Sequence, residues 1–165
     1  MRIPVALLVS AAFLLGCENR ERHQALAKDV KKTAARLCQN PSSNKEGGGC
    51  NADCRVMVRA KAARQSILAA KELARLPKIE DPETETLLVG LRGAARDVLE
   101  KLESACPVPI VPDEPLTDAI RACARAAGAA EAGMAKQRRL FEAFADDVED
   151  RVGVQIKVAS EDCRN

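Results

Sequence analysis

The residues of this chain that are best suited to chemistry are its seven cysteines. A cysteine can form a disulfide, bind a metal ion as a thiolate, or carry a covalent modification. Cys17 directly follows an apolar run, and the other six are distributed over the rest of the chain: Cys38, Cys50, Cys54, Cys106, Cys123 and Cys163. An even set of six in an exported chain is typical of disulfides, although their pairing cannot be chosen from the count alone.

A metal site is the competing interpretation of the cysteines. Cys50 and Cys54 have helical spacing and could supply two ligands. A structural zinc site uses four ligands, usually in two close pairs, and the remaining cysteines are isolated from one another in the sequence. The spacings of redox Cys-x-x-Cys and haem-binding Cys-x-x-Cys-His motifs are absent. We therefore expect disulfides, with no metal ion and no other cofactor.

The first sixteen residues have the pattern of an export signal. Arg2 gives a positive start, and an apolar stretch follows over residues 3–15. A charged start and an apolar run of this length are typical of a signal peptide, whereas a membrane-spanning helix needs about 20 apolar residues. We therefore assign residues 1–16 to a processing signal and residues 17–165 to a single folded domain.

The end of the apolar run, Leu14-Leu15-Gly16-Cys17, resembles the lipobox of bacterial lipoproteins. This resemblance covers about the first twenty residues, and Leu15 departs from the small residue usual at its position. It implies that the chain is cut before Cys17 and that Cys17 carries the lipid, palmitate included. It also accounts for the seventh cysteine. The alternative is an ordinary secretory signal with a chance cysteine.

The same resemblance bears on location. Glu18 stands at the sorting position of such lipoproteins, where aspartate tends to mean retention in the inner membrane of enteric bacteria. Glutamate there favours the outer membrane, and a host with a single membrane leaves the cell membrane as the alternative. In either case the expected protein is lipid-anchored and faces the periplasm or the cell exterior.

Other residues that could do chemistry lack the context that chemistry needs. His23 is the only histidine, and it lies six residues after Cys17. No serine has the Gly-x-Ser-x-Gly context of a nucleophile elbow, and glycines 47–49 lack the spacing and the Lys-Ser/Thr ending of a phosphate-binding loop. The acids of residues 146–150 fall on a predicted helix, without the glycine-containing loop of a calcium site. We expect a protein that is not an enzyme.

The most basic stretch is residues 50–76. Its candidate anion-binding residues are Arg55, Arg59, Lys61 and Arg64. Such a surface could bind an anionic envelope polymer or a lipid headgroup. Alternatively, these cations pair with acids of the next predicted helix, such as Asp97, Glu100 and Glu103. The chain as a whole has 26 Lys and Arg against 24 Asp and Glu, so its net charge does not favour nucleic acid as a partner.

These residues must be positioned by helices, because apolar residues recur with a helical period in most of the chain. We predict helices over residues 18–38 and 50–76, the second ended by Pro77. Asp81 as N-cap and Pro82 at the first position begin a third helix, which reaches Ala105 before a proline-rich connector. The sequence is rich in alanine and has no Trp or Tyr, which favours closely packed helices.

The fourth predicted helix is a single long one, from about Leu116 to Val148, with apolar residues at alternating spacings of four and three. Gly128 and Gly133 weaken it, but the sequence between them contains no capping signal. Residues 152–158 then alternate between apolar and other residues, which favours an extended tail, with a continued helix as the alternative. The prediction is an all-α, antiparallel bundle of about four helices, stapled by disulfides and followed by this tail.

The predicted hairpins bring particular cysteines together. Cys38 ends one helix, and Cys50 and Cys54 begin the next, so Cys38 is expected to pair with one of these two. Cys106 and Cys123 flank the proline connector and are expected to pair with each other. Cys163 would then take the remaining cysteine of the second helix. The alternative is that some thiols stay free in the core.

We therefore expect a lipid-anchored, non-enzymatic helical protein of the bacterial cell envelope. It would act through contacts with a protein partner of the envelope and associate with the membrane through its lipid. The alternative is a binding module for an anionic polymer or lipid headgroup through helix 50–76. The sequence does not predict the oligomeric state.

Overall fold

The structure, a computed structural model, describes residues 6–37, 51–107 and 115–152, with side chains from Arg22 onward. These residues form five helices and no strand: α1 (Ala6–Leu37), α2 (Ala52–Leu73), α3 (Pro82–Leu102), α4 (Asp118–Ala129) and α5 (Glu131–Val152). The predicted all-α helical bundle is confirmed. Residues 153–158 of the predicted extended tail lie outside the described residues, and Val152 is the last residue of α5.

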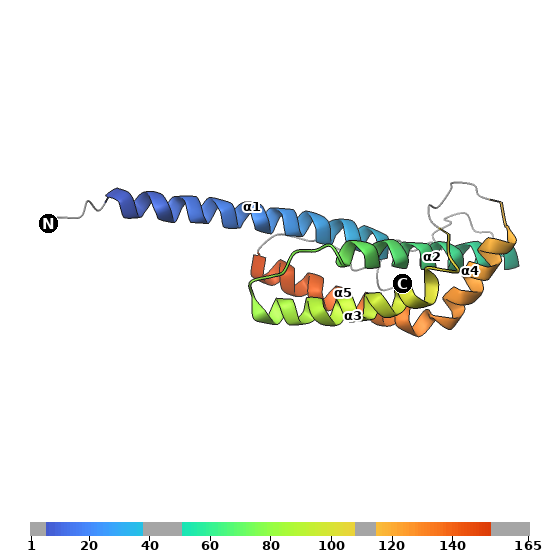
Figure 1. Cartoon of the computed structure of the whole chain (residues 1–165). Coiled ribbons are helices and arrows are strands. Elements are labelled where there is room, and N and C mark those ends of the chain that lie inside the picture. The colour runs from blue at the N-terminus through green and yellow to red at the C-terminus, as the bar shows by residue number, and fades with distance from the viewer. Residues whose placement is uncertain (1–5, 38–50, 108–114, 153–165) are drawn as a thin grey trace.

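Four packed pairs run in opposite directions in Figure 1, namely α1 with α2, α2 with α3, α3 with α5 and α1 with α5, whereas α2 and α4 run in the same general direction. The main packed pairs are α3 with α5, α2 with α4, α2 with α3, and α1 with α2. The first helix begins at Ala6 rather than near Glu18, and it extends beyond the end of the bundle in Figure 1. In the part of the chain that the structure describes, no helix combines the length and the apolar character needed to cross a membrane.

The helices begin where their capping residues predict. The Asp81 carboxylate accepts hydrogen bonds from the backbone N–H groups of Glu83 and Thr84, at 3.1 and 2.9 Å, and Pro82 occupies the first turn of α3. Asn51 caps α2 in the same way, and Thr117 caps α4. Each cap gives an acceptor to an N–H group that has no partner within its own helix.

The prediction of one long fourth helix is wrong, because the chain bends at Ala130 between α4 and α5. Ala130 has φ −98° and ψ 5°, and its N–H is shared between the carbonyls of Ala126 and Ala127. Gly128 and Gly133 lower the helix propensity on either side of the bend. The bend lets α4 pack against α2 while α5 packs against α3, whereas a straight helix would extend past its neighbours (Figure 1).

The core consists of two apolar clusters. The first joins α1, α2, α3 and α5 around Phe141 and Phe144, both fully buried. The second joins α2, α3 and α4 around Ile67, Leu102 and Ile120. Alanines supply much of the remaining contact, which allows the helices to approach closely. Gln137 of α5 is a polar residue among these core side chains and is completely buried.

Candidate functional site

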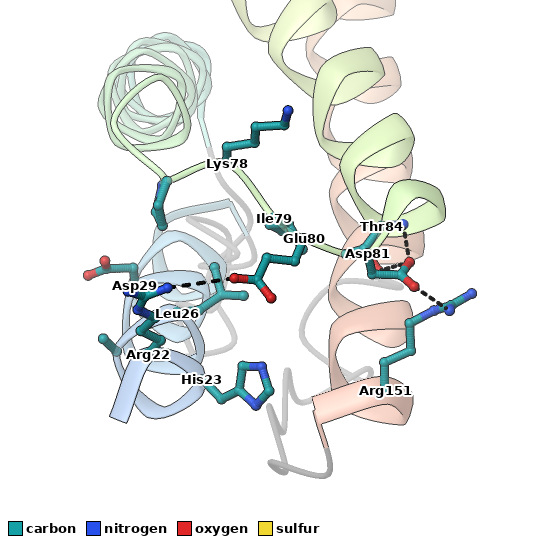
Figure 2. Close-up of a pocket in the computed structure, with 12 residues that line it drawn as sticks. Arg22, His23, Leu26, Asp29, Lys78, Ile79, Glu80, Asp81, Thr84 and Arg151 are labelled. Atoms are coloured by element: carbon teal, nitrogen blue, oxygen red, sulfur yellow. Dashed lines mark hydrogen bonds and ion pairs between the residues drawn. The ribbon is translucent and has the colours of Figure 1, made fainter. Parts of the chain in front are cut away.

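A pocket of about 740 Å³ lies at one end of the bundle, between α1, the segment 77–81 and the adjoining ends of α3 and α5 (Figure 2). Its apolar lining comes from Leu26 of α1 together with Pro77 and Ile79 of the connecting segment. Its polar lining consists of charged side chains, one histidine and one threonine: Arg22, His23, Asp29, Lys78, Glu80, Asp81, Thr84 and Arg151. The pocket therefore combines an apolar surface with charges of both signs.

The connecting segment is itself held in place by hydrogen bonds. The Ile79 backbone N–H donates to the Glu85 carboxylate at 2.7 Å. Arg92 donates to the carbonyls of Leu73, at 3.2 Å, and Leu76. These contacts tie the end of α2 and the following turn to α3, so one wall of the pocket is fixed by side chains of its neighbouring helix.

Arg151 links the two helices that meet beside the pocket. Its guanidinium lies 3.0 Å from the Asp147 carboxylate one turn earlier and 3.0 Å from the Asp81 carboxylate, and it also pairs with Glu83 (Figure 2 shows the contact with Asp81). The Thr84 hydroxyl lies 2.5 Å from Asp147 and 3.0 Å from Asp81. This cluster joins the start of α3 to the end of α5 through five side chains.

The same contacts change the proton affinities of two groups. The pKa of Asp81 is lowered from 3.8, first by the hydrogen bond from the Thr84 backbone N–H and further by the Thr84 hydroxyl and the Arg151 charge. The pKa of Arg151 is raised, first by its hydrogen bond to Asp147 and then by that to Glu83. Both shifts favour the charged forms of Asp81 and Arg151.

This cluster gives the acidic stretch 146–150 a structural role that its sequence did not indicate. Asp147 holds Arg151 and Thr84, rather than lying on a merely solvated helix end. Its i, i+4 spacing to Arg151 could have indicated the first contact. The contacts to Asp81 and Glu83 join residues about seventy positions apart, and no local sequence signal predicts them.

His23 is exposed and lines the pocket, with its ring toward the space between α1 and the end of α5 in Figure 2. Arg22, one residue earlier, forms an ion pair with Glu80 at 3.6 Å. Across the described ranges, no group of three or more His, Cys, Asp or Glu residues is placed to hold a metal ion. The charges of Arg22 and Arg151 have acidic partners and thereby hold the end of the bundle together.

The basic stretch of the second helix does not form a single surface. Arg55, Arg59 and Lys61 are exposed, whereas Arg64 is buried, with 2% of its surface exposed. Arg64 therefore does not lie with the other three candidate anion-binding residues on the surface of α2. Arg64 is buried because the helices pack around it, and its basic neighbours in the sequence gave no indication of this burial.

Part of the charge of α2 pairs across helices, as the alternative interpretation predicts. Lys71 lies 2.6 Å from Glu103 just after α3, and Arg121 of α4 lies 3.8 Å from Asp53. Asp97 and Glu100 are exposed on α3 and form no ion pair with another described residue. Pairing therefore accounts for the charge of Lys71 but not for that of Arg55, Arg59 and Lys61.

The predicted pairing of Cys106 with Cys123 is confirmed. Cys106 and Cys123 form a disulfide with Cα atoms 4.6 Å apart, which joins the end of α3 to α4. Cys54 is also disulfide-bonded. Cys38, Cys50 and Cys163 lie outside the described residues, so their pairing stays a prediction, as does lipidation of Cys17, whose side chain is not described.

Comparison with known proteins adds no family to these observations: no family model, curated protein or solved structure matches the chain. What can be said of function therefore follows from the residues and their geometry.

Proposed function

We propose that this protein is a lipid-anchored, non-enzymatic helical protein of the bacterial cell envelope that acts through contacts with other envelope components. The proposal starts from the charged start, the apolar run and the lipobox-like Leu14-Leu15-Gly16-Cys17. In such an arrangement the folded domain must stand apart from the lipidated residue, and the chain must lose residues 1–16 without losing its core.

The observation that carries this proposal is that the described residues between Cys17 and Leu26 are exposed. From Arg22, where described side chains start, residues 22–25 are exposed, and Leu26 is the first that is buried. Leu26 is nine positions after Cys17, which corresponds to about 14 Å along a helix at 1.5 Å per residue. Residues 18–25 are mostly polar in the sequence, so cleavage before Cys17 would leave them as a tether between the lipid and Leu26.

This geometry also orients the bundle under the proposal. Arg22 and His23, five and six positions after Cys17, line the pocket of Figure 2. A lipid on Cys17 would hold that end of the bundle close to the membrane surface. The opposite end, with the Cys106–Cys123 disulfide and the bend at Ala130, would then face away from the membrane and be open to partners.

Metabolic labelling tests the proposal directly. Cells that express the full chain would be fed an alkyne analogue of palmitate, and the purified protein would be assayed for incorporated label. We expect label on the wild-type chain and on the matched control Asn19→Ser, and none on Cys17→Ser. Equal labelling of Cys17→Ser, or no labelling of the wild type in a lipoprotein-processing host, would contradict the anchor.

A second candidate function is the binding of an anionic envelope polymer or lipid headgroup through α2. The observation that favours it is that Arg55, Arg59 and Lys61 are exposed and form no ion pair with another described residue. Vesicles of phosphatidylglycerol and phosphatidylcholine test it in the lipid form. Loss of sedimentation with Arg55→Glu/Lys61→Glu, but not with the matched α3 variant Arg96→Glu, supports the function; equal behaviour of the two variants contradicts it.

A further inference from the structure

We propose that a second pocket, beside the bend between α4 and α5, binds a phosphate group through Arg59 and Arg138. The pocket has a volume of about 250 Å³ and lies between α2 and the segment that contains the bend. This proposal does not depend on lipidation of Cys17. It assigns a phosphate ligand to one defined pocket, whereas the second candidate function involves the basic surface of α2 as a whole.

Small residues make the hollow. Ala62 of α2, Ala127 and Gly128 of α4, and Ala135 of α5 line it. A Cβ atom added to Gly128 would meet no other atom within 4 Å, which shows that the space beside this residue is open. Because the chain bends at Ala130, α4 and α5 diverge here, and side chains as short as alanine do not fill the resulting gap.

Two arginines from different helices line this pocket. Arg59 and Ser66 are seven positions apart on α2, as are Glu131 and Arg138 on α5, so each pair lies on one face of its helix. The two faces meet at the pocket. Arg59 is exposed, whereas Arg138 is half-buried.

Neither arginine is neutralised by an acid within the described residues. Arg36, Arg92 and Arg121 each have a carboxylate within 4 Å, at 2.8, 3.9 and 3.8 Å. No described carboxylate lies within 4 Å of Arg59 or Arg138, although Glu131 lines the same pocket. The lining therefore carries two positive charges and one negative charge, and the excess is positive.

Arg138 also has a hydrogen-bonding group that lacks an acceptor. Its Nε is shielded from solvent and has no hydrogen-bond partner. A guanidinium has five N–H donors. A donor that is buried without an acceptor is unfavourable, because burial removes its hydrogen bond to water. A ligand with several acceptor oxygens would draw the guanidinium toward the pocket and give its donors partners.

The ligand class follows from the donors and the size of the pocket. Guanidinium groups bind phosphate through two parallel hydrogen bonds, and a tetrahedral oxyanion offers enough oxygens for two arginines at once. A space of this volume admits a phosphate group but not a whole polymer chain. The phosphate could come from free inorganic phosphate or from a phospholipid headgroup, and the shared chemistry is the phosphate itself.

Calorimetric titration of the full chain in detergent micelles tests the proposal. One arm adds inorganic phosphate, and the other adds mixed micelles that contain phosphatidic acid. We expect saturable binding in at least one arm, competition by sulfate and none by chloride. The arm that binds identifies the source, and saturable binding in neither arm would overturn the proposal.

The variants separate this pocket from general surface charge. We expect Arg138→Gln and Arg59→Gln each to weaken binding roughly tenfold or more, since each loses charged hydrogen bonds. The matched control is Arg139→Gln, which removes the same charge from the neighbouring exposed position outside the pocket. Equal weakening by Arg139→Gln would overturn the proposal. Circular dichroism checks folding, and Arg59, being exposed, keeps the test valid if the Arg138 variant unfolds.

Discussion

Replacing Gln137 by methionine should stabilise the protein. Gln137 is completely buried in the seam between α5 and α2. Its Nε2 donates to the Ser66 carbonyl at 3.4 Å, a long and therefore weak hydrogen bond, and its Oε1 is shielded from solvent without a partner. A methionine has a similar length and flexibility and places no unpaired amide in the core.

The expected change in the free energy of unfolding is the balance of two effects: the substitution loses one weak hydrogen bond, and it removes one buried oxygen that has no partner. A buried polar atom without a partner costs about 1–3 kcal/mol, while a weak neutral hydrogen bond contributes about 0.5 kcal/mol. The Ser66 carbonyl lies within α2 and remains able to accept the helical N–H of Ala70. We therefore expect Gln137→Met to raise the free energy of unfolding by about 1 kcal/mol, or the melting temperature by about 2–4 °C.

Urea denaturation followed by circular dichroism measures this change. Gln24→Met is the matched control, because Gln24 is exposed on α1, and its substitution should change the free energy of unfolding by less than about 0.5 kcal/mol. A Gln137→Met protein less stable than the wild type by 1 kcal/mol or more would refute the reasoning. Such a result would mean that the Gln137 Oε1 accepts a hydrogen bond in the folded protein in solution.

Three further predictions concern α3, the disulfide and the Asp81 cluster. Gly90→Ala and Gly93→Ala should each raise the free energy of unfolding, measured in urea, by about 0.5–1 kcal/mol. Both glycines are exposed in α3, and an added Cβ meets no atom within 4 Å. A loss of stability would show that the helix surface is covered there. Removing the disulfide by the double change Cys106→Ala/Cys123→Ala should cost about 3 kcal/mol, from a cross-linked separation of 17 residues. An unchanged urea midpoint under non-reducing conditions would contradict that bond. The lowered pKa of Asp81 contributes stability that is present above its unfolded pKa of 3.8 and is lost as the pH falls through the lower folded value. Asn also caps helices well, so Asp81→Asn should keep the helix start but show a smaller fall in melting temperature than the wild type between about pH 4 and pH 2. Parallel pH profiles for the two proteins would count against the ionic contribution.

The helices and one disulfide could be predicted because their signals are local. Asp81 and Pro82 define the start of α3 within four residues, and the apolar period defines which face is buried. The Cys106–Cys123 pair was predictable because both cysteines flank one short connector between antiparallel helices. In each case the residues that determine the outcome are close together in the sequence.

The bend at Ala130 could not be predicted, because its cause lies in packing. Alanine favours helix on both sides, and the apolar period continues through the bend, so the local pattern describes one helix. The break arises because α4 and α5 find different partners, α2 and α3. The unpredicted pocket beside Arg138 is a consequence of that bend, since it opens where the two helices diverge.

The burial of Arg64 and the cluster around Arg151 were missed for a related reason. Arg64 belongs to a basic stretch whose other members are exposed, and only the neighbouring helices enclose it. Arg151 meets Asp81 across a separation of 70 residues. Such contacts depend on the arrangement of the helices, which the sequence period alone leaves open.

The most direct test of the central claim is mass spectrometry of the N-terminal peptide of the protein purified from membranes of a lipoprotein-processing host. The proposal predicts a peptide that begins at Cys17 and carries a mass increase equal to a diacylglycerol group, with or without a further acyl chain. A peptide that begins at Cys17 without lipid, or one that still contains Leu14-Leu15-Gly16, would contradict it.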